Sequence, residues 1–175
     1  MVTSAVETFR ARAEEAQSSV HALAGWPEVA ALAIALAGDG RVALAPSLAR
    51  AQPALLAWLG ARALLPDAAA PAASVADAAV GIVRGALAVA ETGSVLLIEP
   101  DLADRCVSML SRALIQVVER GRVVESLDAV PGALAEAGQP AYASLTTGPS
   151  RTADIERSLT IGVQGPHAVH VVVLG

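Results

Sequence analysis

Lysine is absent from this chain of 175 residues, and cysteine and aromatic residues are scarce. All twelve basic residues are arginines without a run, so the sequence lacks the clustered basic face that a nucleic-acid partner requires. The single cysteine, Cys106, cannot form an intramolecular disulfide, and no spacing of cysteine and histidine suits zinc or an iron–sulfur cluster. We therefore expect no nucleic-acid partner, no metal site and no cofactor bound by this chain.

Long uninterrupted apolar runs are also missing, although 54% of the residues are apolar and 17% are charged. The run at residues 29–38 is too short to span a membrane, and the run at 158–175 is interrupted by polar residues, glycine and proline. Near the start, Glu7, Arg10 and Glu14 stand where a signal peptide would have an apolar core. We expect no membrane span and a cytoplasmic location.

What the sequence does contain is a regular alternation of helix and strand patterns. Strands are predicted at residues 20–23, 41–45, 62–65, 79–83, 94–98, 113–118, 142–146 and 168–174, and helices up to residue 17 and at 27–38, 53–60, 101–110, 128–138 and 151–157. Residues 66–77 are predicted as a loop, with a helical turn from Ser74 as the alternative, and 84–93 as a tight connection. This order predicts one domain over residues 1–175, an α/β three-layer sandwich.

Polar residues of the second half gather in two segments at strand ends, where α/β sheets usually bind ligands. The segments are residues 90–94 and 146–156. In the second, Gly148 allows close approach of the backbone, a predicted helix N-terminus favours an anion, and Arg151 offers a planar fork for carboxylate or phosphate. The alternative is a plainly capped helix, in which Ser150 or Thr152 bonds its own backbone and Arg151 is solvated.

Glu91 is the candidate acid/base, because its apolar neighbours would raise the pKa of a desolvated carboxyl. The alternative is a loop carboxylate that accepts backbone N–H bonds and holds the turn before Ser94. His21 and His170 are predicted as structural residues of strands, and His167 as a turn residue near the site. A P-loop is excluded because it needs lysine, and no hydrolase, zincin or dinucleotide-binding motif occurs.

Three ordered motifs resemble those of the lactate-utilisation (LUD) domain family. They are residues 90–97 (AETGSVLL), 147–156 (TGPSRTADIE) and 162–166 (GVQGP), the last before the apolar strand at 170–173. The resemblance is carried by residues 78–175, and over the first 77 residues only the helix and strand rhythm is similar. It implies a fold like that of sugar-phosphate isomerases and CoA transferases, a three-layer α/β/α sandwich with a mainly parallel sheet.

The resemblance also implies a role in oxidising L-lactate to pyruvate, together with partner proteins that carry iron–sulfur clusters. We predict a site for a small carboxylate or a phosphate-bearing ligand between the two polar segments, with Glu91 as its acid/base. The predicted ligand-binding residues are Thr92, Gly93, Gly148, Pro149, Ser150, Arg151, Thr152, Asp154 and Gly165. Two alternatives stay open: an independent acyl-CoA transferase or sugar-phosphate isomerase that uses Glu91, and a non-catalytic assembly subunit.

Overall fold

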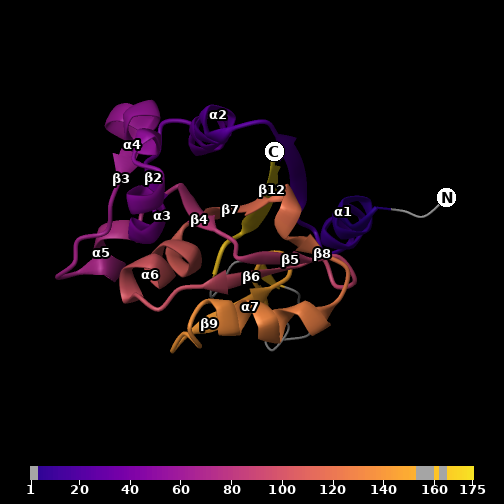
Figure 1. Ribbon diagram of the computed structural model, residues 1–175. Coiled ribbons are helices and arrows are strands. Elements are labelled where there is room, and N and C mark those ends of the chain that lie inside the picture. The colour runs from indigo at the N-terminus through magenta and orange to yellow at the C-terminus, as the bar shows by residue number, and fades with distance from the viewer. Residues whose placement is uncertain (1–3, 153–159, 162–164) are drawn as a thin grey trace.

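A six-stranded parallel sheet forms the centre of the computed structural model, which describes residues 4–152, 160–161 and 165–175 (Figure 1). Every neighbouring pair of strands in it is parallel. The strand order is β1 (Ser19–Leu23), β12 (Ala168–Leu174), β7 (Ala113–Glu119), β4 (Val80–Arg84), β2 (Val42–Leu44) and β3 (Ala63–Leu64). The predicted α/β class and the mainly parallel sheet are confirmed.

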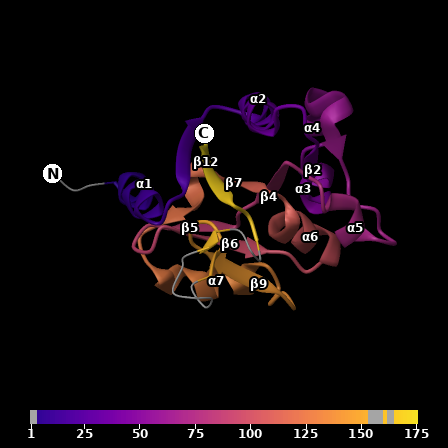
Figure 2. The same cartoon turned by 180° about the vertical axis from the view of Figure 1, so that it is seen from behind.

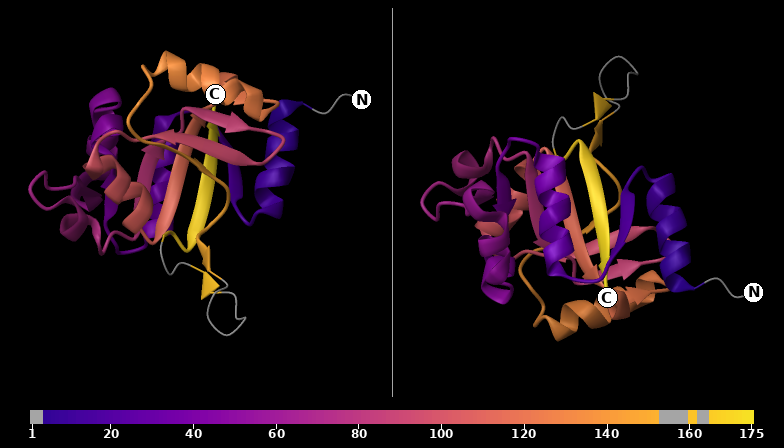
Figure 3. Two further views of the ribbon diagram at one scale, coloured as in Figure 1. Left: turned by 90° about the horizontal axis from the view of Figure 1, so that it is seen from below. Right: turned by 90° about the horizontal axis from the view of Figure 1, so that it is seen from above.

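Helices flank this sheet on both faces, as the two opposite views of Figure 3 show. On one face α2 (Trp26–Ala37) contacts β1, β2 and β4 and packs on α4 (Ala54–Leu59). On the other, α6 (Leu102–Leu110) packs on β4, α3 (Pro46–Ala51) and α5 (Pro71–Val75). Helix α1 (Ala5–Glu15) contacts β1 and β8 (Val123–Val124). None of these described helices is long and apolar enough to cross a membrane.

A second sheet of four strands packs under the first, beside α6 (Figures 1 and 2). Its order is β8, β5 (Leu87–Val89), β6 (Ser94–Ile98) and β9 (Ala143–Thr146), and β6 is antiparallel to both neighbours. Helix α7 (Val130–Glu136) covers its outer face, where Leu87, Val89, Leu96 and Ala133 form a small core. Residues 84–93 therefore contain a strand where the sequence predicts only a tight connection.

Two further local predictions differ from the structure. Residues 66–77 were expected as a loop, yet α5 begins at Pro71, whose fixed φ suits a first helical turn. A helix was expected at 151–157, but Arg151–Thr152 forms strand β10, paired antiparallel with β11 (Thr160–Ile161). Arg151 pairs with Ile161 and Thr152 with Thr160, ten and eight positions away, so a pattern confined to residues 151–157 does not reveal the pairing. Residues 153–157 lie outside the described residues.

Local signals at the first two helices are confirmed. Ser4 caps α1 through its side chain, and the Glu7 carboxylate accepts the Ser4 backbone N–H at 2.9 Å, which completes a capping box. Helix α2 ends at Ala37, and its C-cap residue Gly38 has a φ of +57°, which favours glycine. The main core contains Phe9, Ile82 and Ile115, all fully buried, so α1 and two central strands share one interior.

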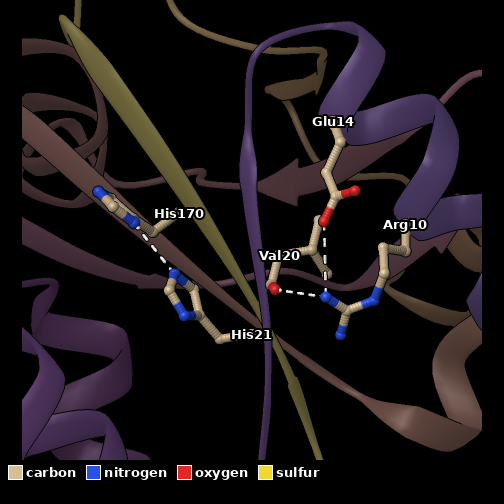
Figure 4. A network of polar contacts seen from close by, with 5 residues as sticks. All are labelled: Arg10, Glu14, Val20, His21 and His170. Atoms are coloured by element: carbon tan, nitrogen blue, oxygen red, sulfur yellow. Dashed lines mark hydrogen bonds and ion pairs between the residues drawn. The ribbon is translucent and has the colours of Figure 1, made fainter.

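His21 and His170 join the first and last strands of the chain (Figure 4). Nε2 of His21 lies 3.1 Å from Nδ1 of His170, and the rings stack with their centroids 5.3 Å apart. Burial lowers the pKa of both imidazoles, with smaller contributions from the Arg10 charge at His21 and from His21 at His170. Arg10 also donates to the Val20 carbonyl at 2.8 Å, which ties α1 to the same edge.

Candidate functional site

A pocket of about 300 Å³ lies between residues of the two sheets. Leu114, Gln116 and Val169 line it from the first halves of β7 and β12, and Ser144 and Thr146 line it from β9. Its other walls are Leu97, Ser108, Met109, Tyr142, Thr147, Gly148, Pro149, Ser150, Gly165 and Pro166. The lining therefore combines apolar side chains with several hydroxyl groups, a common composition for small-molecule sites.

Hydrogen bonds at this pocket bring the three sequence motifs together. Ser94, from the first motif, has its hydroxyl 2.5 Å from the hydroxyl of Thr147, which begins the second. Ser150 donates its backbone N–H to the carbonyl of Pro166, in the third motif, at 3.1 Å. Segments far apart in the sequence thus meet at one wall.

Two motif glycines, Gly148 in this wall and Gly93 in the turn before β6, allow close packing on the C-terminal end of α1. Gly148 has a φ of +71°, and a Cβ added there would lie 2.1 Å from the carbonyl oxygen of Ala16. Gly93 has a φ of +66°, and its Cβ would lie 2.4 Å from the backbone nitrogen of Ala13. Because any side chain would clash with helix backbone at both positions, the N-terminal helix takes part in shaping the site.

Gln116 is the buried polar residue of β7, with only 1% of its surface exposed. Thr146 donates its hydroxyl hydrogen to the Val95 carbonyl at 3.2 Å, so the same oxygen accepts from Nε2 of Gln116 at 2.7 Å. This fixes the orientation of the amide and leaves Oε1 buried, with no partner among the described residues. A buried acceptor without a donor costs about 1–3 kcal/mol, so a bound molecule with a hydroxyl or N–H group would stabilise this arrangement.

The chain matches the model of the LUD domain family over residues 5–174. This chain belongs to the LUD domain family. The resemblance carried by residues 78–175 therefore extends across the N-terminal half as well, in agreement with the contacts of α1 at the two motif glycines.

Sequence relatives of this LUD domain carry the name lactate utilization protein C. Lactate utilization protein C 1 of Bacillus mycoides (strain KBAB4) is 35% identical over 92 residues, which cover 50% of this chain and 39% of that protein. Lactate utilization protein C of Shouchella clausii (strain KSM-K16) is 34% identical over 106 residues, with 58% and 45% covered. The matched segments thus span less than half the length of these relatives.

The fold is similar to the crystal structure of a DUF162 family protein from Deinococcus radiodurans. The TM-score is 0.69 at 22% sequence identity, and the match covers 99% of this chain and 100% of the other. Similarity at this identity concerns the fold alone.

The structure places four of the predicted ligand-binding residues of this LUD domain on the pocket wall: Gly148, Pro149, Ser150 and Gly165. Thr92 and Gly93 lie in the turn between β5 and β6, outside the lining, and the Thr92 hydroxyl is buried without a partner in the described part of the chain. Arg151 and Thr152 start β10, directly after Ser150, and Asp154 lies outside the described residues.

Glu91 lies in the same turn and is exposed. One of its carboxylate oxygens accepts the backbone N–H of Leu127 at 2.7 Å, and its own N–H donates to the Glu125 carbonyl at 3.0 Å. This is the contact expected of a carboxylate that holds a turn. An acid/base role for Glu91 stays a prediction that requires the ligand to reach this turn.

Sequence reasoning did not single out Gln116, Ser144 or Ser108, and it included Thr146 only as the first residue of the polar segment 146–156. For Gln116 a signal existed, because it is the lone polar residue in the apolar run at 113–118. The hydroxyl residues gave no such signal, since serine and threonine are common at strand ends. None of the lining residues described by the structure carries a charged side chain. Nor do the described residues gather three or more metal-ligating side chains.

A larger cavity of about 690 Å³ lies at the carboxyl ends of β4 and β7. Its charged side chains pair with one another, Arg84 with Glu119 and Arg122 with Glu136. Ligands of open α/β sheets usually bind outside the carboxyl ends of the strands, which favours this edge of the sheet. The three motifs, however, meet at the smaller pocket, and so we take that pocket as the candidate site.

Proposed function

We propose that this LUD domain acts in lactate utilisation by binding a small hydroxy- or ketocarboxylate, such as lactate or pyruvate, in the pocket between the sheets. The name of its relatives supports the substrate class. The observation that carries the proposal is that Gln116, a residue of the pocket wall, has a buried Oε1 with no partner among the described residues. That oxygen can accept a hydrogen bond from the hydroxyl group of a 2-hydroxy acid.

The carboxylate end of such a ligand has donors within the same walls. Thr147 and Ser150 belong to the lining and have hydroxyl groups. Arg151 follows Ser150 in the chain, and its guanidinium fork matches a carboxylate in two parallel hydrogen bonds. Since the described lining carries no charged side chain, we assign the main anion-binding role to Arg151, the next residue along the chain.

We further propose that the chain works in the cytoplasm beside iron–sulfur partner proteins that carry the redox cofactors, and binds no cofactor itself. Purification of the tagged chain from its native host, followed by identification of bound proteins and their iron content, tests this. Recovery of iron–sulfur partners is the expected result. An assembly role without a ligand predicts the same partners but no calorimetric binding of any small anion.

Calorimetry on the wild-type chain and Gln116→Met tests the pocket, with L-lactate, pyruvate, phosphate and CoA as probes. Loss of one neutral hydrogen bond should weaken L-lactate binding about two- to tenfold, and pyruvate, which lacks the hydroxyl donor, should lose less. Gln52→Met, outside the pocket, is the matched control and should bind like the wild type. Equal L-lactate affinity in wild type and Gln116→Met would remove the support for this site.

Arg151→Lys tests the anion-binding role, because lysine keeps the charge but loses the fork. Losing a charge-assisted bond of this kind should cost about 1.5–3 kcal/mol, on the order of ten- to a hundredfold in affinity. The melting temperature should stay within a few degrees of the wild type. Unchanged affinity with a large fall in melting temperature would instead identify Arg151 as a structural clamp.

A further inference from the structure

Behind the pocket wall lies a buried carboxyl group that the proposed function does not use. Glu99 follows β6, and only 4% of its surface is exposed. One carboxyl oxygen, Oε2, lies 2.9 Å from the hydroxyl of Ser108 on α6, while Oε1 is buried with no partner among the described residues. No cation of the described chain lies within ion-pair distance of it.

Ser108 connects this carboxyl group to the pocket, because its side chain both contacts Glu99 and belongs to the lining. The hydroxyl has one hydrogen and two acceptors in reach, Oε2 of Glu99 at 2.9 Å and the Arg105 carbonyl at 3.1 Å. When Glu99 is protonated, it donates to Ser108 and Ser108 donates to Arg105, so both bonds form. When Glu99 is ionised, Ser108 must turn its hydrogen to the carboxylate, and the bond to Arg105 is lost.

The charges near Glu99 come from α6. The pKa of Glu99 is raised to about 7, mainly by burial; the hydrogen bond from Ser108 and the Arg105 charge lower it, and the Asp104 charge adds to the rise. Asp104 is itself buried and accepts the backbone N–H of Ser47 at 3.0 Å. The Arg105 guanidinium stacks over the Tyr142 ring, 4.8 Å from its centre. Near neutral pH, then, Glu99 exists in both protonation states.

We propose that Glu99 is a proton-linked positioning residue of the pocket: it takes up a proton when an anionic ligand binds, and Ser108 turns its hydroxyl accordingly. A carboxylate in the pocket adds negative charge near a buried carboxyl that has no ion-pair partner in the described chain, which favours the neutral form of Glu99. The proton comes from water or a buffer acid, whose bond to that hydrogen breaks as an O–H bond forms on Glu99, and no other covalent bond changes. This inference rests on the proposed function, since it needs an anion in the pocket.

The test is calorimetry of L-lactate and pyruvate binding at pH 7 in buffers of different ionisation enthalpy, which counts the protons exchanged. The wild type should take up as much as about half a proton per anion bound, because the carboxyl is about half ionised there. Affinity should fall as pH rises from 6 to 8. Glu99→Gln, of nearly the same shape but without a titrating proton, should show neither effect. Glu15→Gln, which removes an exposed carboxylate on α1, should behave like the wild type.

Ser108→Ala separates a proton-linked role of Glu99 from a purely structural one, because only the first predicts a change in the pH dependence of proton uptake. Without the hydroxyl, the ionised carboxylate loses its hydrogen bond, so the pKa of Glu99 rises and the pH of maximal proton uptake moves above that of the wild type. Anion binding without proton uptake in the wild type, or uptake that survives Glu99→Gln, would overturn this inference and leave the proposed function standing. Failure of the wild type to bind any probe would overturn the proposed function, and the inference with it.

Discussion

The buried carboxyl of Glu99 makes a prediction about folding that needs no ligand. Its pKa is about 7 in the folded chain against 4.5 for the free group, because burial disfavours the charged form. The folded state therefore binds more protons than the unfolded state between those two values, and stability falls as pH rises through that range. The difference corresponds to about 3 kcal/mol, which is present below about pH 4.5 and lost above about pH 7.

Glu99→Gln removes this loss, because the amide never ionises and its NH₂ group can donate to the Ser108 hydroxyl as the protonated acid does. We expect wild type and variant to have similar stability near pH 5, and the variant to be more stable at pH 8 by as much as about 3 kcal/mol. The assay is urea denaturation at several pH values, followed by circular dichroism. Parallel pH profiles for the two proteins would refute the reasoning, and Glu15→Gln should follow the wild type.

Two other substitutions should change stability for separate physical reasons. Burial lowers the pKa of His170, so the unfolded state binds its proton at a higher pH, and the free energy of unfolding falls as pH drops below about 6.5. His170→Gln should lessen that fall in denaturation curves between pH 7 and 5, whereas substitution of the exposed His167 by Gln should not. Gly148→Ala combines a left-handed φ with a clash at the Ala16 carbonyl, so it should lower the free energy of unfolding by about 2–5 kcal/mol in the same assay. Gly132→Ala, whose Cβ would meet no atom within 4 Å, should lower it little, and equal losses for the two variants would show that the close contact with the end of α1 adjusts easily.

The strand β5 and the pocket residue Gln116 show where sequence reasoning stopped. The short apolar stretch Leu87–Val89 was visible, but nothing local distinguishes a strand in a second sheet from a turn between two strands of one sheet. Gln116 was visible as a polar residue in an apolar run. Its significance depends on Thr146 and Val95, which approach it only when β6 and β9 pack over β7.

Local chemistry was enough to predict much of the chain. The capping box of Ser4 and Glu7, the stop at Gly38 and the apolar strands at 80–84, 113–119 and 168–174 follow from groups within a few residues of one another, so the sequence alone determined them. The order of the three motifs was likewise enough to indicate the LUD family.

Only the tertiary structure decided what those motifs build. Strand pairing joins segments that are distant in the chain, so the second sheet, the meeting of Ser94 with Thr147 and the close contact of Gly148 with α1 have no local signature. Burial is equally non-local: Glu99 and Glu91 are both carboxyls beside apolar residues in the sequence, yet the fold desolvates the first and exposes the second. The free energy of removing a charge from water depends on what surrounds the group in space, and the buried surroundings of Glu99 raise its pKa to about 7.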